Sequence, residues 1–529
     1  MNCTIFKHED SKNKEMALLL YYILNLPEPL EVSCEEIPEN QASVGINTYS
    51  ENCSMITDPL YSQQWHFTTI NLNTTWQSYC GSNVKIGIID DGLEIYHEDL
   101  TANVEGGKSY NYKTGTTDPS GNPVDGDSIH GTAVAGLIAA KDNSLGIRGV
   151  SPKSSIRGYN AIATGSLSNI VDATVKDIEN VWISNNSWGP SDGTGLLVSS
   201  DSLWQSAILQ GLRQGRFGLG TLYIFAAGNG AQVNSYLADN SNYDEYANFY
   251  GITAVCAVGL DEKQASYSEK GANLWICAPS MGNNNSGLVT TDLTGAYGYN
   301  SNYFLNDLPN NKYTKFFSGT SGSTPIVSGA LALLLQSKPY LSWRDVRLIL
   351  ARSAKKNDPT DSDWTTNAMG YSINHKYGFG LLDVQKAIQI ANSWTNLGSY
   401  KKCTVKNIHV HQDIIDNGPP TISEFDASIL GINKIEWVEV TIHINHQYFG
   451  DLQINLYSPS GTEAILAEPH NCFYNNQQIG CNMGDIVFRF GIARFLEENA
   501  NGKFRIEIQD KHAKDNGYFK KWDLTLFGR

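Results

Sequence analysis

The chain has 529 residues, of which 41% are hydrophobic and 11% aromatic, so it can form two or three globular domains with large cores. Its formal net charge of −16 at pH 7 excludes a general nucleic-acid binder and is compatible with basic peptide ligands. No apolar stretch is long enough to span a membrane, and the longest early run, residues 16–26, also lacks the flanks of a signal peptide.

Residues 1–55 are expected to form an N-terminal extension. The nine cysteines of the chain suit an oxidising compartment, and we therefore expect a secreted or cell-surface protein with disulfide bonds. Proximity along the chain favours three disulfides and leaves three cysteines unassigned, at least one of them a free thiol: Cys34–Cys53, Cys256–Cys277 and Cys472–Cys481; Cys3, Cys80 and Cys403.

The first segment with chemical character is KIGIIDDG, residues 85–92. The run 84–89 is apolar and β-branched, which predicts a buried parallel strand. Asp90 stands at the carboxyl end of this strand, where open α/β sheets place their ligands and their chemistry. Taken alone, such an aspartate is more often a cap or a turn residue.

Two later segments complete a pattern. HGTAVAG begins at His130, where a helix with small residues is predicted to open, and GTSGSTP places Ser321 just before an apolar helix. The chain order Asp, His, Ser is one in which serine hydrolases carry their catalytic triad. We therefore expect His130 to take the Ser321 proton while Asp90 holds the imidazole tautomer.

Further motifs resemble those of subtilisin-like serine proteases, and more narrowly of the kexin and furin branch, the proprotein convertases. They are DPLYSQQW (58–65), DDG (90–92), SWGP (187–190), TTDL (290–293), SWRD (342–345) and YGFGLLD (377–383). The resemblance runs from Asp58 to the C-terminus. It implies a subtilisin-like α/β catalytic domain over residues 56–395, with a mostly parallel sheet and helices on both faces. It also implies that Asn229, in AGNG, donates a hydrogen bond to the oxyanion; a simple turn asparagine is the alternative.

From Cys403 onward, hydrophobic and polar residues alternate, as in 438–444 and 452–456, with the turn signal SPSG at 458–461. This pattern predicts an all-β sandwich. Because it follows the predicted protease, it resembles the P domain of the convertases, and we expect a jelly-roll-like P domain over residues 396–529. An unrelated β module, such as a carbohydrate-binding one, is the alternative.

The resemblance implies a preference for Lys or Arg at P1, the substrate residue before the cleaved bond, because a basic side chain needs a carboxylate in its pocket. Asp192 and Asp244 would lie in the S1 pocket that binds P1. Asp91 and Asp127 would favour a basic residue at P2, and Asp172 would serve a more distant subsite. Aspartates that only form turns are the alternative. The full predicted substrate-binding set is Asp91, Asp127, Asp172, Ser187, Trp188, Gly189, Asp192 and Asp244.

The resemblance also implies two Ca²⁺ sites, since hard cations bind several oxygens at once. The first lies in the loop KDNSLGI at 141–147, for which a metal-free turn is the alternative, and the second lies near S1. The first would use the carboxylates of Asp58 and Asp99, the side chain of Asn143 and the carbonyls of Lys141, Leu145 and Ile147; the second would use Asp192, Asp239 and Glu269.

We interpret the chain as a serine endopeptidase that acts through an acyl-enzyme and prefers Lys or Arg at P1, above all at dibasic sites. The alternatives are a broad-specificity subtilisin-type protease and a non-catalytic binding or adhesion protein. The expected partners are proteins and peptides with basic residues, and no nucleic acid. Because no Lys-Arg or Arg-Arg pair precedes Asp58, we expect either a propeptide already removed or folding help from a separate chaperone.

Overall fold

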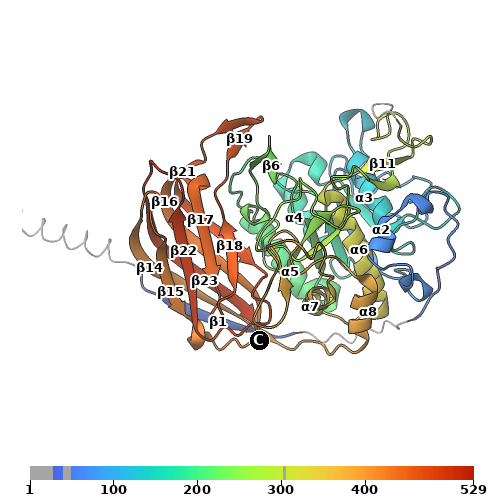
Figure 1. Ribbon diagram of the computed structural model, residues 1–529. Coiled ribbons are helices and arrows are strands. Elements are labelled where there is room, and N and C mark those ends of the chain that lie inside the picture. The colour runs from blue at the N-terminus through green and yellow to red at the C-terminus, as the bar shows by residue number, and fades with distance from the viewer. Residues whose placement is uncertain (1–27, 40–48, 302–305) are drawn as a thin grey trace, which may run out of the picture.

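The computed structural model describes residues 28–39, 49–301 and 306–529. Figure 1 shows two bodies side by side, an α/β domain and a β-rich domain made mainly of the C-terminal part of the chain. The predicted fold class, a subtilisin-like α/β domain followed by a β sandwich, is confirmed. Among the described residues, no helix has the length and apolarity needed to cross a bilayer.

A six-stranded parallel sheet organises the α/β domain. Its order is β3 (Ser155–Tyr159), β2 (Lys85–Ile89), β4 (Ile183–Asn186), β5 (Leu222–Ala226), β8 (Ile252–Val258) and β9 (Ile276–Pro279). These strands are almost wholly buried, because helices cover both faces, and their sequences are therefore short apolar or small-residue runs. After β2 the chain crosses first to β3 and then to β4 on the other side. The loops that follow β2 and β4 diverge at this switch point, where open α/β sheets bind their ligands.

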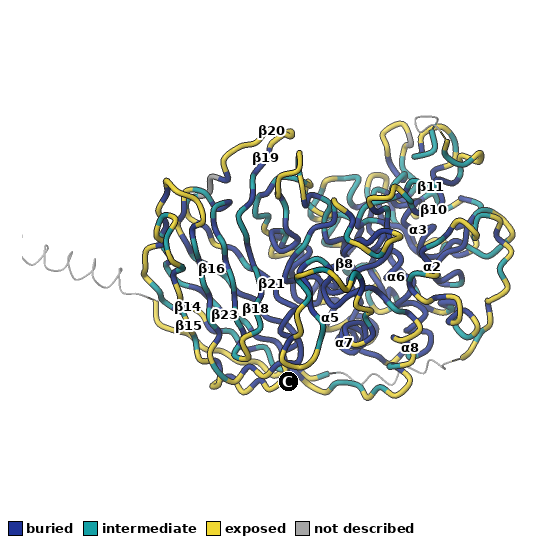
Figure 2. The backbone as a smooth tube through the Cα atoms, viewed as in Figure 1, coloured by how far each residue is buried: buried dark blue, intermediate teal, exposed yellow. Residues whose placement is uncertain are grey.

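Helices cover the sheet, and one of them runs through the middle of the domain. Figure 2 shows this helix, α6, as a buried element, and it lies along β4, β5, β8 and β9 with α3 beside it. The helices are α2 (His66–Thr69), α3 (Ile129–Ala139), α4 (Leu167–Val175), α5 (Ser202–Gln214), α6 (Thr320–Ser337), α7 (Trp343–Ser353) and α8 (Val384–Asn392). Within the described residues, four two-stranded antiparallel sheets lie outside the main sheets: β6 (Gln232–Val233) with β7 (Tyr236–Leu237), β10 (Leu288–Thr291) with β11 (Tyr313–Phe317), β12 (Thr365–Thr366) with β13 (Ser372–Ile373), and β19 (Cys472–Tyr474) with β20 (Gln477–Ile479).

The β domain packs a five-stranded sheet on a four-stranded one. The first has the order β1 (Glu31–Ile37), β14 (Tyr400–Ile414), β23 (Gly517–Gly528), β16 (Ile435–Tyr448) and β21 (Asn482–Ile492); the second has the order β15 (Thr421–Asp426), β22 (Lys503–Asp510), β17 (Leu452–Tyr457) and β18 (Glu463–Ala467). Burial alternates residue by residue in β17 and β22, which explains the period-two pattern of the sequence. Their inward side chains, such as Leu452, Ile454 and Ile506, fill the space between the sheets.

The described part of the N-terminal extension joins the β domain. Strand β1 pairs antiparallel with β14 at the edge of the larger sheet, and Cys34 lies opposite Cys403 and forms a disulfide with it. The expected Cys34–Cys53 bond is therefore wrong, and Cys53 instead bonds Cys80. The reason is topological, because pairing of β1 with β14 brings together two cysteines 369 residues apart. The other two expected bonds, Cys256–Cys277 and Cys472–Cys481, are confirmed, whereas Cys3 and the apolar run 16–26 lie outside the described residues.

The two domains share one hydrophobic core. Trp437 and Phe527 of the β domain belong to the same buried cluster as the α/β residues Tyr250 and Trp275. The rings of Tyr250 and Phe527 stack with their centroids 3.6 Å apart. The guanidinium of Arg347 lies 3.7 Å from the Trp275 ring and 5.0 Å from the Trp437 ring, so a cation fills the gap between two tryptophans.

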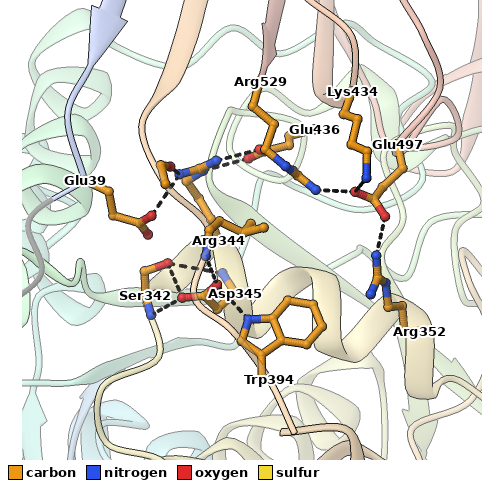
Figure 3. Close-up of polar contacts among 12 residues, drawn as sticks. Glu39, Ser342, Arg344, Asp345, Arg352, Trp394, Lys434, Glu436, Glu497 and Arg529 are labelled. Atoms are coloured by element: carbon orange, nitrogen blue, oxygen red, sulfur yellow. Dashed lines mark hydrogen bonds and ion pairs between the residues drawn. The ribbon is translucent and has the colours of Figure 1, made fainter.

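A network of ion pairs borders this shared core, and we call it the clasp (Figure 3). Arg344 of α7 makes two bonds of 2.7 and 2.6 Å to Glu436 of β16 and contacts Glu39 at 3.4 Å. Arg529, the C-terminal residue, also bonds Glu436 at 2.7 Å and pairs with Glu497, which in turn pairs with Arg352 of α7. The clasp therefore joins the α/β domain, the β domain and residue 39 beyond β1.

Candidate active site

The switch point of the sheet positions the first two predicted catalytic residues. Asp90 follows β2 directly, and His130 is the second residue of α3. The helix approaches the strand so closely that a Cβ at position 131 would lie 1.9 Å from the carbonyl oxygen of Gly92. Glycine is thus required after the histidine, which explains the His-Gly pair of the sequence.

The side chains of Asp90 and His130 form a hydrogen-bonded pair. His130 Nδ1 lies 2.7 Å from Asp90 Oδ1, which also accepts the Asp91 backbone N–H at 2.8 Å. Burial lowers the pKa of His130, but the charge and hydrogen bond of Asp90 outweigh burial and raise the pKa above its ordinary value. The pair therefore favours an imidazolium, the species that a general base forms when it takes a proton.

Ser321 lies in the first turn of α6, and two hydrogen bonds join it to Ser187, the residue that follows β4. Pro325 has no N–H, so the carbonyl of Ser321 lacks its usual helical donor, and the Ser187 hydroxyl donates to it at 3.2 Å instead. The Ser321 hydroxyl in turn donates to the Ser187 carbonyl at 3.2 Å. The positively polarised start of α6 thus lies at the nucleophile, where it favours developing negative charge.

Asn229 lies in the loop after β5 with its amide fixed in one orientation. Its side-chain oxygen accepts the backbone N–H of Thr320 at 2.7 Å and the hydroxyl of the same residue at 2.9 Å. The amide oxygen is therefore engaged and the NH₂ group is the end left to donate, as an oxyanion donor requires. The backbone N–H of Asn229 donates to Asp192 Oδ1 at 2.8 Å.

A cavity of about 190 Å³ opens beside Ser321. The predicted S1 residues Asp192 and Asp244 both lie in its wall. Asp244 is the more enclosed, and burial raises its pKa to about 7. A Cβ built on Gly189 would lie 3.5 Å from Asp244 Oδ2, so this carboxylate faces the segment that follows β4. The lining includes Ser187, Trp188, Gly189, Pro190, Asp192, Gly228, Asn229, Asp239, Asn240, Tyr243, Asp244, Glu269 and Ser321.

Three carboxylates meet at the rear of this cavity. Oxygens of Asp192, Asp239 and Glu269 lie within 4.8 Å of one another. Burial raises the pKa of Asp239 to about 6 and raises that of Glu269 well above its ordinary value. This oxygen-only donor set, with charge that burial disfavours, fits a hard cation.

The predicted calcium loop also assembles. Asp58 Oδ1 accepts the backbone N–H groups of Asn143 and Ser144 at 3.0 Å, and Asp99 Oδ2 accepts that of Ile147 at 3.0 Å. The second oxygen of each aspartate is buried and lacks a hydrogen-bond partner within the described chain. Burial raises the pKa of Asp58 to about 6 and that of Asp99 to about 7. Two orphaned carboxylate oxygens beside the 141–147 loop fit Ca²⁺.

The other predicted subsite acids have partners within the chain. Both oxygens of Asp91 accept backbone N–H groups at the start of α3, from His130 at 2.9 Å and Gly131 at 2.8 Å. Asp127 is bound by the ammonium of Lys113 at 2.8 and 2.6 Å. Asp172 accepts the hydroxyl of Tyr112 and the ammonium of Lys176 on its own helix, at 2.6 and 2.8 Å.

Sequence reasoning missed two features: the Lys113 ammonium that pairs with Asp127, and the β-domain residues that contact the cavity wall. Lys113 stands 14 residues before Asp127, a spacing that carries no signal. Phe473 and His470 bond the carbonyls of Thr194 and Gly195, next to Asp192, from more than 270 residues away. Gly195 has a positive φ of 69° and is closely approached by Asn471, and both features require glycine at this position. Neither feature can be inferred from the sequence alone.

Comparison with known proteins identifies the families that the two domains match. Residues 81–380 match the subtilase family, and residues 435–526 match the proprotein convertase P-domain. Human proprotein convertase subtilisin/kexin type 7 is 30% identical over 492 residues, which covers 89% of this chain and 60% of that protein. Bovine furin is 29% identical over 490 residues, covering 89% of this chain and 58% of furin. The dibasic-processing endoprotease of Schizosaccharomyces pombe is 29% identical over 508 residues, covering 91% and 67%.

Solved structures extend the comparison to the whole described body. The serine protease of Aeromonas sobria is similar with a TM-score of 0.78 at 28% identity, covering 93% of this chain and 100% of that one. The same protease, solved in complex with its chaperone ORF2, has a TM-score of 0.79 at 27% identity, covering 93% and 99%. The chain spans about 60% of the length of the human convertase it matches. With more than half of its length matched by the family and its Asp90, His130 and Ser321 at the switch point of the sheet, the chain belongs to the subtilase family and has a proprotein convertase P-domain after its subtilase domain.

Proposed function

We propose that the chain is a serine endopeptidase that cleaves after basic residues through an acyl-enzyme on Ser321. One observation carries the proposal, namely that Ser321 lines the same cavity as Asp192 and Asp244. The Asp90–His130 pair and the oriented amide of Asn229 supply the remaining parts of an acyl-transfer site.

The residues divide the reaction as follows. His130 takes the Ser321 proton as the oxygen attacks the substrate carbonyl, and Asp90 stabilises the imidazolium that forms. The NH₂ group of Asn229 donates to the oxyanion. In such sites a donor of this kind lowers the activation barrier by about 2.7–4 kcal/mol. His130 then protonates the leaving amine, the acyl-enzyme remains on Ser321, and water releases the acid by the reverse proton transfers.

Ca²⁺ binding at two sites forms part of the proposal. Asp58, Asp99 and Asn143 with the carbonyls of the 141–147 loop would hold one ion, and Asp192, Asp239 and Glu269 would hold the other. The support is the pair of orphaned buried oxygens at the first site and the three converging carboxylates at the second. Bound calcium would neutralise this buried negative charge and tie the loops together.

A catalytic test comes first. Wild type should hydrolyse a fluorogenic peptide with arginine at P1, and Ser321→Ala should reduce kcat by about 10⁶-fold. Wild type should also react with a fluorophosphonate at Ser321. If wild type and variant have equal rates and the probe does not label the serine, the chain is a binding or adhesion protein instead.

A peptide-library cleavage profile tests the specificity. We expect cleavage after Arg or Lys, favoured by a second basic residue at P2. Asp192→Asn and Asp244→Asn should each lower kcat/KM for arginine substrates at least about tenfold more than for leucine substrates, because each removes a charged hydrogen-bond partner. A wild type that prefers large apolar residues at P1 would make the chain a broad-specificity subtilisin-type protease.

Chelation tests the calcium proposal. Excess EDTA should lower the thermal midpoint, and added Ca²⁺ should restore it, since a ligand that binds only the native state stabilises it. Asp99→Asn should show a smaller response than wild type, whereas Asp426→Asn, an exposed change in the P domain, should respond as wild type does. An unchanged midpoint after prolonged chelation contradicts calcium binding.

We further propose that the protein is secreted and that its folding requires help from another chain or a removed segment. Four disulfides among the described residues support an oxidising location. The solved complex of the similar Aeromonas sobria protease with a chaperone supports the need for help. Refolding from denaturant with the disulfides intact should return little activity, and full unaided recovery would contradict the second part.

A further inference from the structure

The P domain reaches the wall of the S1 cavity. The backbone N–H of Phe473 donates to the Thr194 carbonyl at 2.9 Å, and that of Asn471 donates to the Leu237 carbonyl at 2.9 Å. A Cβ at Gly195 would lie only 2.3 Å from the carbonyl oxygen of Asn471. Figure 1 shows the same proximity, with β19 of the P domain beside β6 of the subtilase domain. The loop that holds Asp192 is therefore packed on P-domain backbone.

Beside Cys472, whose Sγ lies 3.2 Å from the Gly195 carbonyl oxygen, His470 makes a side-chain contact in this region. Its Nε2 lies 2.8 Å from the Gly195 carbonyl oxygen, and its Nδ1 lies 2.8 Å from the Glu468 carbonyl oxygen. The ring is buried, packs on the Tyr243 ring with centroids 4.8 Å apart, and is anchored by its backbone N–H to the Gly450 carbonyl. Although Cys472 and Cys481 are close to His470, they form a disulfide, so this group is no metal site.

From Gly195 the contacts continue to the S1 acids. The backbone N–H groups of Gly193, Thr194 and Gly195 all donate to the Asp239 carboxylate. Asp239 faces Asp192 within the carboxylate cluster, and Asp192 accepts the backbone N–H of Asn229. The Gly195 carbonyl and the Gly195 N–H belong to adjacent peptide units joined at the Gly195 Cα, so a shift of the carbonyl would displace the N–H that Asp239 accepts. Asp239 would move with it, and so would Asp192, the acid proposed to meet a basic P1 side chain.

We propose that His470 of the P domain is a positioning residue for S1, which holds the 193–195 loop so that Asp192 and Asp239 keep their places in the cavity. The inference rests on the proposed function, because it assumes that Asp192 recognises a basic P1 residue. His470 is not among the residues that line the cavity, and it acts through the Gly195 carbonyl.

The test compares two substitutions in the full chain. His470→Phe keeps an aromatic ring packed against Tyr243 but removes the N–H donor, whereas His470→Gln keeps a donor. On enzyme titrated with a fluorophosphonate, His470→Phe should lower the arginine-to-leucine ratio of kcat/KM by about fivefold to tenfold, mainly through KM for the arginine substrate. For His470→Gln, the decrease in the logarithm of the arginine-to-leucine ratio of kcat/KM should be at most half of the decrease that His470→Phe causes.

Benzamidine, a basic molecule of P1 size, gives a readout that needs no turnover. In the Ser321→Ala background, adding His470→Phe should weaken benzamidine binding by about the same factor. The control is His446→Phe, since His446 is also buried in the P domain but bonds only P-domain groups, the Tyr448 carbonyl at 2.9 Å and Asp510 at 3.2 Å. It should lower the melting temperature and leave the P1 ratio and benzamidine affinity unchanged.

The outcomes separate this inference from the proposed function. If wild type prefers arginine and Asp192→Asn loses the preference, but His470→Phe keeps it, the positioning role is wrong and the proposed function stands. If His446→Phe reduces the ratio as much as His470→Phe does, the effect is general destabilisation and the inference also fails. A wild type without arginine preference overturns both.

Discussion

The subtilase and P domains meet at two ends of one interface, and the two ends use different chemistry. At the clasp, Arg344, Glu436, Arg529 and Glu497 form a charged network around the shared aromatic core (Figure 3). At the cavity, His470 and the 471–473 backbone form hydrogen bonds with backbone carbonyls of the subtilase domain, beside one ion pair, that of Lys270 with Glu468.

This difference follows from what each end must do. A buried charge that loses its partner costs several kcal/mol, so separating the domains at the clasp is strongly unfavourable. Oriented hydrogen bonds to backbone carbonyls fix geometry at small energetic cost, which suits a wall that must hold a pocket shape. We therefore expect changes at the clasp to alter stability without altering specificity, and changes at the cavity end to do the reverse.

Removal of the whole P domain should have the largest effect. Truncation after Trp394 would expose Tyr250 and Trp275, which Phe527 and Trp437 cover in the full chain. We expect little soluble, active protein, because the core is continuous across the two domains. Expression yield and fluorophosphonate labelling measure this, with full-length Ser321→Ala as the control for expression. A stable, fully active fragment of residues 1–394 would show that the shared core is dispensable.

Arg344→Met tests the clasp alone. It leaves Glu436 buried with only Arg529 as partner, and we expect a loss of about 3 kcal/mol in the free energy of unfolding, with the P1 ratio unchanged. Arg505→Met, which removes the more exposed arginine paired with Glu507, should cost no more than about 1 kcal/mol. A changed P1 ratio in Arg344→Met would show that the two ends of the interface are not independent.

His375 makes the interface sensitive to acid. Its Nε2 accepts the backbone N–H of Ile465 in the P domain at 3.0 Å, and its Nδ1 lies 3.0 Å from Asp363. Burial, aided by the charges of Arg494 and Lys270 and opposed by Asp363, lowers the pKa of His375 from 6.5 to about 4. The unfolded state therefore binds more protons between these values, so this contribution to stability is full above pH 6.5 and is lost as the pH falls towards 4.

The measurement is the free energy of unfolding at several pH values for wild type and His375→Gln. The wild-type value should fall by about 3 kcal/mol more than that of the variant between pH 7 and pH 4, because the pKa of His375 is lowered from 6.5 to about 4 and each pKa unit corresponds to 1.36 kcal/mol. Parallel pH curves for the two proteins would exclude the role of His375.

Lys113→Met should have the smallest effect, since it lies in the subtilase domain and touches neither end of the interface. It frees Asp127, and we expect the preference for a basic over a neutral P2 residue to rise about twofold to fivefold, within the range of a partly exposed ion pair. Stability should change little. Lys503→Met, which breaks an exposed pair with Glu424 in the P domain, should leave the P2 preference unchanged. A P2 preference that Lys113→Met does not alter would remove Asp127 from the subsite.

The sequence by itself determined the features that depend on residues close together in the chain. The strand before Asp90, the glycine after His130 and the small-residue turn at Ser321 are each required by contacts within a few residues of the motif or by close helix approach. The β domain was equally predictable, because burial alternates residue by residue in strands such as β17 and β22, and the sequence alternates with it.

Tertiary structure alone decided what depends on residues distant in the chain. The Cys34–Cys403 bond and strand β1 arise because the sheet edge at β14 accepts another strand, and nothing near Cys34 records that partner. The Lys113 contact that occupies Asp127 and the His470 contact to Gly195 likewise join segments whose spacing has no periodicity. Local propensity and pattern act over a turn or a strand, whereas these pairings depend on how distant segments pack in the finished fold, so the sequence could name the candidate catalytic residues but not the P-domain residues that contact their cavity.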